Sequence, residues 1–135
     1  MKRLLLALLP ALVACGSADA SASAAFPLVV TTSNGTFVIE ASTSDGRQPG
    51  RGLVTFDFFI VRSAGGAPVS ELTVKVTPWM PAMGHGAPEP KRVVPHDLGH
   101  YRVEDVALYM PGMWELRTSI AGPTDEHATL ALEVL

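Results

Sequence analysis

The amino-acid sequence predicts an all-β protein, an antiparallel β-sandwich of about seven strands. Three observations carry this prediction. Apolar residues recur at every second position in several runs, turn-forming residues separate these runs at short intervals, and no helical period of useful length follows the N-terminal segment.

The strands are predicted from the period-two pattern. Apolar side chains alternate with polar ones from Val54 to Ile60 and from Leu72 to Val76, as in strands with one buried face. Glycine, proline, asparagine and aspartate mark the turns between runs. The spacing of strands and turns is typical of an immunoglobulin-like sandwich. The predicted strands are Leu28–Thr31, Gly35–Ala41, Val54–Ile60, Leu72–Thr77, Tyr101–Tyr109, Trp114–Ile120 and Ala128–Leu135.

One predicted strand changes its alternation part-way. The apolar positions are odd up to Val103 and even from Val106 onward. An extra residue in the strand restores the inward direction of the apolar side chains, so we expect a β-bulge or tight corner at Glu104-Asp105. The predicted core aromatics are Phe37, Phe56, Phe58, Tyr101 and Trp114.

The N-terminal segment has the features of a secretory signal peptide. Lys2 and Arg3 precede an apolar run over residues 4–14, which is shorter than the roughly 20 residues that span a bilayer as a helix. The run ends in Leu-Val-Ala before Cys15, a pattern that resembles the bacterial lipobox. We expect cleavage before Cys15 and lipid on its sulfur, with membrane attachment that follows from the acyl chains. Cleavage after Ala20 is the alternative.

The rest of the chain is predicted to form one domain behind a tether. Residues 1–14 are the signal peptide, 15–27 a flexible Ser/Ala-rich tether and 28–135 the sandwich. Gly16 follows the cysteine where aspartate commonly retains lipoproteins at the inner membrane, so a Gram-negative outer membrane, facing the periplasm, is favoured. Net charge is −3 without a run of Lys or Arg, so we expect no nucleic-acid partner. With one cysteine, no disulfide forms within the chain.

Four methionines fall in two copies of one motif. These copies are Met80-Pro81-Ala82-Met83 and Met110-Pro111-Gly112-Met113, and they account for every methionine after Met1. A thioether is a neutral, polarisable donor suited to Cu(I), and imidazole suits both copper oxidation states. Thioethers form no disulfides and stay usable outside the cytoplasm. The sequence predicts a copper site, with Cu(I) favoured. The first-choice ligands are Met80, Met83 and His85, and the second-choice ligands are Met110, Met113 and His96.

Structural explanations of the same residues stay open. Methionine fills gaps beside aromatic rings, so Met110 and Met113 are also explained by packing on Trp114 or Tyr109. Trp79 is either a shielding aromatic above a Cu(I) site or a residue that covers the sandwich rim.

Three segments together resemble a known family. They are residues 79–86, which read Trp-Met-Pro-Ala-Met-Gly-His-Gly, residues 99–101, Gly-His-Tyr, and residues 110–116, Met-Pro-Gly-Met-Trp-Glu-Leu. The combination resembles the YtkA-like domain, whose relatives include FixH-type proteins, over roughly residues 36–135. The resemblance implies an exported immunoglobulin-like or cupredoxin-like sandwich, similar in shape to CopC-type copper proteins and associated with copper handling or oxidase assembly. Pro111 and Met113 depart from the second motif. The matched positions are Met80, Met83, His85, Met110, Gly112 and Trp114.

Two functions fit these residues. The first is a lipid-anchored copper-binding or copper-delivery module of the bacterial cell envelope, whose partner donates or accepts copper. The second is a metal-free module that uses the methionine loops as an adaptable apolar surface for a partner in an envelope or oxidase-assembly complex. We expect no enzyme, because the common nucleophile, zinc and phosphate-loop motifs are missing from the sequence.

Overall fold

The structure of the chain is a computed structural model that describes residues 26–122 and 124–135. The predicted signal peptide, Cys15 and the tether up to residue 25 lie outside the described residues. Within them the one helical segment is a three-residue 3-10 turn, and no helix there is long and apolar enough to cross a membrane.

The described chain is built from nine strands. In chain order the elements are β1 Leu28–Thr31, β2 Phe37–Thr43, β3 Gly52–Arg62, β4 Thr73–Met80, η1 Pro81–Met83, β5 His85–Gly86, β6 Arg92–Pro95, β7 His100–Leu108, β8 Gly112–Ala121 and β9 Glu126–Val134. All seven predicted strands are present. β5 and β6, of two and four residues, were not predicted, and β5 is too short to show an alternating pattern.

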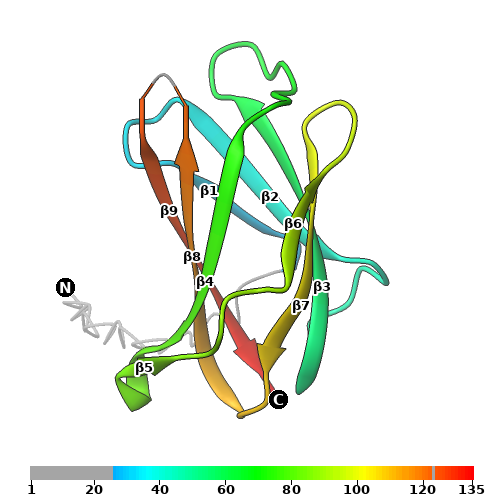
Figure 1. The fold of residues 1–135 in the computed structure, drawn as a ribbon, viewed down its shortest axis with the longest axis vertical. Coiled ribbons are helices and arrows are strands. Elements are labelled where there is room, and N and C mark those ends of the chain that lie inside the picture. Colours follow the sequence, from blue (N-terminus) through cyan, green and yellow to red (C-terminus); the bar gives the residue numbers. More distant parts are fainter. Residues whose placement is uncertain (1–25, 123) are drawn as a thin grey trace, which may run out of the picture.

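The strands form two antiparallel sheets that pack as a sandwich, which confirms the predicted fold class (Figure 1). One sheet has the order β1-β2-β3-β7-β6 and the other β5-β4-β8-β9. Both η1 and the β7–β8 connection lie at the lower end of Figure 1, the end at which the C-terminus also lies. The β6–β7 loop and the β8–β9 turn lie at the upper end.

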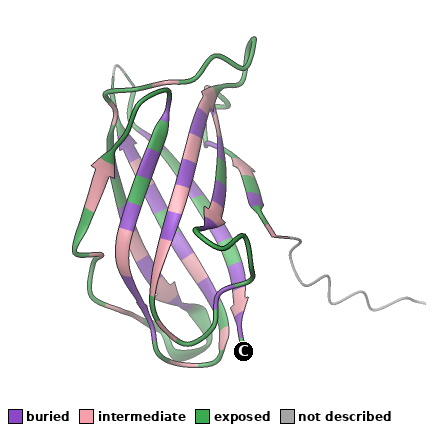
Figure 2. Ribbon diagram, turned by 90° about the vertical axis from the view of Figure 1, so that its right-hand side faces the viewer, coloured by how far each residue is buried: buried purple, intermediate pink, exposed green. Residues whose placement is uncertain are grey.

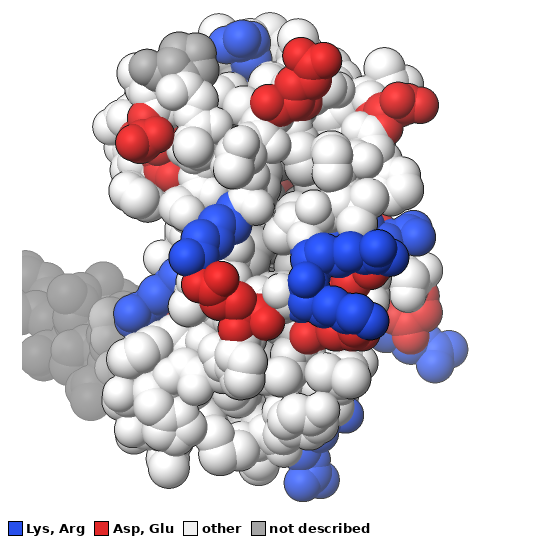
Figure 3. Space-filling model, in the orientation of Figure 1, with Lys and Arg blue, Asp and Glu red and all other residues white. Residues whose placement is uncertain are grey.

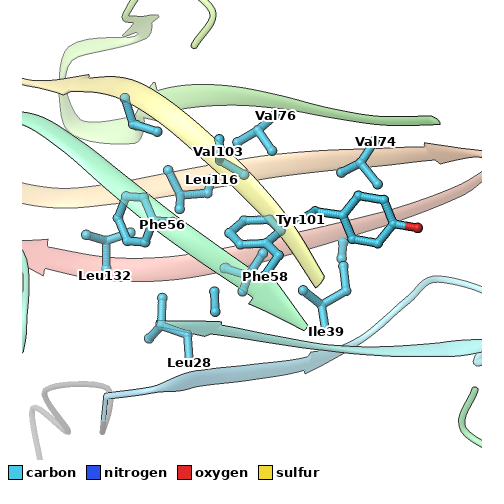
Figure 4. Close-up of a cluster of buried hydrophobic side chains, with 14 of the residues drawn as sticks. Leu28, Ile39, Phe56, Phe58, Val74, Val76, Tyr101, Val103, Leu116 and Leu132 are labelled. Atoms are coloured by element: carbon cyan, nitrogen blue, oxygen red, sulfur yellow. The ribbon is translucent and has the colours of Figure 1, made fainter. Parts of the chain in front are cut away.

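The core lies between the sheets and is made by the inward side of each alternating strand. Buried and exposed residues alternate along the strands in Figure 2, and Figure 4 shows aliphatic and aromatic side chains from both sheets meeting between them. Tyr101 is buried and its hydroxyl donates to the Val69 carbonyl at 2.8 Å, so its polar atom is satisfied. All five predicted core aromatics are buried: Phe37, Phe56, Phe58, Tyr101 and Trp114.

The predicted irregularity in β7 is a bulge. Val54 of β3 faces Val106, whereas Phe56, two residues further along, faces Val103, so β7 carries one extra residue opposite β3. Asp105 takes a positive φ of 58° there. The bulge turns Leu108 toward the core and so fixes the direction in which β7 enters the second methionine loop.

A buried carboxylate closes the upper end of the sandwich. Glu126, at the start of β9, accepts hydrogen bonds from the hydroxyls of Thr32, in the β1–β2 loop, and Thr124. Burial raises the pKa of the Glu126 carboxyl, but hydrogen bonds from Thr32, Thr36 and Thr124 outweigh burial and hold the pKa below its usual value. The ionised carboxylate therefore ties the β1–β2 loop to the β8–β9 turn.

Candidate functional site

The first methionine motif forms a tight reversal at the end of β4. Pro81 opens η1, where its missing N–H costs no hydrogen bond, and Gly84 ends the turn with a left-handed φ of 66°. The Gly84 N–H donates to the carbonyls of Met80 and Pro81 at 3.1 and 3.2 Å. The chain then runs back along β4 as the short strand β5.

This reversal places His85 directly opposite Met80. The two residues are Cα partners in the β4–β5 ladder. Partners in an antiparallel ladder point to the same face of the sheet, with Cβ atoms about 5 Å apart. Met80 is 6% exposed, whereas His85 is exposed. A buried thioether and an accessible imidazole therefore lie side by side.

The second methionine motif packs against the first through Gly112. This glycine begins β8 with a φ of 120°, and the Cε atom of Met80 lies 3.0 Å from the position that a Cβ atom would take on it. A larger residue here would be strained and would press on the Met80 methyl group. The segments from Met80 to Gly86 and from Tyr109 to Met113 thus meet at one end of the sandwich, which we call the methionine end.

Met110 and Met83 lie differently at the methionine end. Met110 is partly buried and packs against the core, and its carbonyl accepts a hydrogen bond from the Trp114 indole N–H at 2.9 Å. Met83, in η1, is 55% exposed. At the methionine end, the first motif therefore presents Met83 to solvent, whereas the second presents Met110, which is anchored on the core.

Met113 points away from Met80. It pairs with Glu133 in the β8–β9 ladder and is 49% exposed, whereas the next residue, Trp114, is buried. Successive side chains of a strand point to opposite faces, so Met113 lies on the outer face of the sheet and Met80 on the inner face. The structure thus brings Met80, Met83, His85 and Met110 to the methionine end and turns Met113 outward.

Trp79 also lies on the outer face, because it adjoins Met80 in β4. The guanidinium carbon of Arg117 stands 4.5 Å from the centroid of its ring. The ring also lies close to Gly86, where an added Cβ would be 3.3 Å from Trp79 Cε3. The structure therefore places Trp79 as a cover for the outer side of β4 and β5, and not above the sulfur of Met80.

His96 lies far from the methionines. It belongs to the β6–β7 loop at the upper end in Figure 1, beside the other sheet. Its N–H donates to the His100 carbonyl at 2.7 Å. The inclusion of His96 in one site with the methionines is thus not supported by the geometry. Its position in the sequence between the two motifs is misleading, since β6 and β7 carry the chain to the opposite end and back.

The methionine end has little charge. Residues 80–87 contain no Asp, Glu, Lys or Arg, and on the face shown in Figure 3 most charged side chains lie in the middle and upper parts of the molecule, with basic groups also at the lower right. In the part of the chain that the structure describes, no three His, Cys, Asp or Glu side chains are placed to hold a metal ion together. A metal held at the methionine end would therefore depend on thioethers, which favours a soft cation.

Two features of this site were not predicted from the sequence. The pairing of His85 with Met80 depends on β5, which has no recognisable strand pattern. The close approach of Met80 to Gly112 depends on the register of β4 and β8, although a glycine inside a strand start is itself a signal of close approach.

Comparison with known proteins gives the family. The model of the family described as YtkA-like matches residues 29–119, more than half of the chain and including both methionine motifs. The chain belongs to the YtkA-like family. No curated protein and no solved structure matches it. The match covers β1 to most of β8, so both segments of the methionine end fall within the YtkA-like domain.

Proposed function

We propose that this YtkA-like protein binds copper as Cu(I) at the methionine end and passes it to or from another protein. The observation that carries the proposal is the pairing of Met80 with His85, on the same side of the sheet and in contact with the second motif through Gly112. One thioether and one imidazole in this arrangement are donors that Cu(I) favours. Met83 and Met110 are the further ligands, from η1 and the β7–β8 connection.

The different exposure of the proposed ligands supports a role in copper delivery. Met80 is fixed by the core, whereas Met83 and His85 are open to solvent. A bound ion with Met80 and Met110 held against the core and two accessible ligands can exchange the accessible ones for donors of a second protein. The proposal needs no catalytic step and no nucleic acid.

The place of action is also part of this proposal. Lipid on Cys15 would hold the protein on the periplasmic side of a bacterial membrane, with the outer membrane favoured, and residues 16–25 would let the domain reach a copper-donating or copper-accepting envelope protein.

Competition with a Cu(I) chelator tests the site. The purified chain is titrated anaerobically against bicinchoninate, with Met80→Leu/Met83→Leu as the test variant and Met113→Leu as the matched control. Leucine approximately conserves volume, so the fold is kept. We expect at least about a tenfold loss of affinity in the double variant and none in the control, since even outer-shell changes cost about tenfold. Equal affinity in both variants would contradict the assignment.

A metal-free interaction module is the second candidate. Met83, Tyr109 and Met113 are 55%, 64% and 49% exposed, which is a large apolar exposure for one end of a small domain. Elemental analysis after loading with Cu(I) and washing separates the two functions. Copper in a one-to-one ratio favours the first, and its absence favours the second.

A further inference from the structure

Each methionine motif holds its first side chain against the core and exposes its second. Met80 is 6% exposed, and Met110 is partly buried against the core. Met83 and Met113 are 55% and 49% exposed. Met83 lies in η1 beside the proposed copper ligands, whereas Met113 lies on the outer face of β8. The protein therefore has two thioethers of similar exposure, of which one is a proposed copper ligand.

The exposed thioethers are the side chains of this domain that oxidants attack most readily. Residues 26–135 contain no cysteine, so methionine sulfur is the softest nucleophile there. The sulfur attacks the electrophilic oxygen of hypochlorous acid or hydrogen peroxide and loses two electrons to it. The O–Cl or O–O bond breaks, and a sulfoxide forms with release of chloride and a proton, or of water. The step needs access to the sulfur and no catalytic group, so its rate follows exposure.

Oxidation of Met83 changes a copper ligand at a place where the fold tolerates a polar group. No residue of η1 is buried, so a sulfoxide at Met83 stays in solvent. The same change at Met80 would bring a polar group into the core, where its burial is unfavourable. A sulfoxide has a hard oxygen and an electron-poor sulfur, so it is a weaker donor to Cu(I) than a thioether. The copper site is therefore weakened while the domain stays folded.

We propose that Met83 is a reversible oxidation site that controls copper binding, an inference that rests on the proposed Cu(I) site at the methionine end. Hypochlorous acid or hydrogen peroxide converts Met83 of the copper-free protein to the sulfoxide, and the site then binds Cu(I) weakly. Methionine sulfoxide reductases restore the thioether, because the side chain is accessible to them. Met113 is oxidised at a similar rate without effect on copper, since it lies on the outer face. We call this the oxidation switch.

Peptide mapping by mass spectrometry tests which methionines are oxidised. The copper-free full chain is treated with a limiting amount of hypochlorous acid, quenched with free methionine and digested. We expect Met83 and Met113 to be oxidised at least about tenfold faster than Met80, whose side chain is buried. Oxidation of Met80 at the same rate as Met83 would overturn the proposal.

Two single variants connect the modification to copper. Met113→Leu keeps Met83 as the exposed thioether, and Met83→Leu keeps Met113. Each variant is oxidised, freed of oxidant and titrated anaerobically against bicinchoninate beside its own untreated sample. We expect oxidation to lower the Cu(I) affinity of Met113→Leu by at least about tenfold and to leave that of Met83→Leu unchanged. Treatment with the reductases for both sulfoxide epimers should restore the affinity of Met113→Leu.

The outcomes separate the oxidation switch from the proposed function. Affinity that persists in oxidised Met113→Leu, or that falls equally in both oxidised variants, would overturn the switch and leave the copper site in place. An untreated chain that binds no Cu(I) would overturn the proposed function and the switch with it. A near-ultraviolet circular dichroism spectrum that is lost on oxidation would attribute the lower affinity to unfolding and would overturn the switch alone.

Discussion

The two ends of the sandwich use polar and polarisable groups in opposite ways. At the upper end the buried Glu126 carboxylate accepts hydrogen bonds from Thr32 and Thr124, and among the described residues no buried side-chain nitrogen or oxygen lacks a hydrogen-bond partner. At the methionine end, Met83 and His85 are exposed without such internal partners among the described residues, apart from a 3.3 Å contact between His85 Nδ1 and the Gly86 carbonyl. The upper end therefore stabilises the fold, whereas the methionine end leaves its donor atoms available to a ligand.

The largest expected effect is at the upper end. Glu126→Ala removes a buried carboxylate and leaves the Thr32 hydroxyl only the Phe37 carbonyl, at 3.3 Å, as an acceptor, so we expect the free energy of unfolding to fall by about 3 kcal/mol in a urea titration. Glu115→Ala is the control, because Glu115 forms a surface ion pair with Arg117 at 2.8 Å, and its loss should cost under about 0.5 kcal/mol. Similar losses in both variants would remove the distinction between the ends.

A substitution of histidine at each end tests where the imidazole ligand lies. We expect His85→Asn to weaken Cu(I) binding by about tenfold in the chelator assay, because the residue opposite Met80 loses its nitrogen donor. His96→Asn should leave the affinity unchanged, since His96 lies at the upper end. A loss of affinity in His96→Asn alone would reverse this assignment.

Alanine substitutions at two glycines distinguish the effect of backbone strain from the effect of the contact with Met80. Gly35 and Gly112 have φ values of 74° and 120°, so alanine at either should cost about 1 kcal/mol of stability. Only at Gly112 does the added Cβ meet Met80, at 3.0 Å, whereas at Gly35 it meets nothing within 4 Å. We therefore expect a several-fold loss of Cu(I) affinity in Gly112→Ala and none in Gly35→Ala. Identical copper binding in the two variants would show that the Met80–Gly112 contact is irrelevant.

The smallest expected effect is a pH dependence from the upper end. The pKa of Glu126 is lower folded than unfolded, so its contribution to stability is present above the unfolded value of about 4.3 and is lost as pH falls through the folded pKa. Urea midpoints measured from pH 7 to about 3 should fall less steeply in Glu126→Gln than in the wild type. The carboxyls of the exposed Asp45 and the half-buried Glu104, whose pKa values are also lowered, remain in both proteins. Parallel pH profiles would contradict the role given to Glu126.

Much of the fold was predictable because its signals are local. Alternation in β3 and β8 identifies the buried face without knowledge of any partner strand, and the change of alternation after Val103 identifies the bulge. The position of β5 was not predictable, since His85-Gly86 becomes a strand only because the turn at Gly84 lays it beside β4.

The candidate site was predictable in part. Two repeated motifs indicated that the methionines belong together, and Met80 and Gly112 do meet. Which face a side chain takes, and which end of the sandwich a loop reaches, depend on register and strand direction. Those long-range properties turn Met113 outward and carry His96 to the far end, and no local pattern reports them.

X-ray absorption at the copper edge of the Cu(I)-loaded chain tests the central claim most directly, because it identifies the atoms bound to the metal. We expect sulfur neighbours together with one imidazole nitrogen, and a loss of sulfur neighbours in Met80→Leu/Met83→Leu that Met113→Leu does not show. A copper ion surrounded by nitrogen and oxygen alone, or sulfur neighbours that persist in the double variant, would contradict a thioether site at the methionine end.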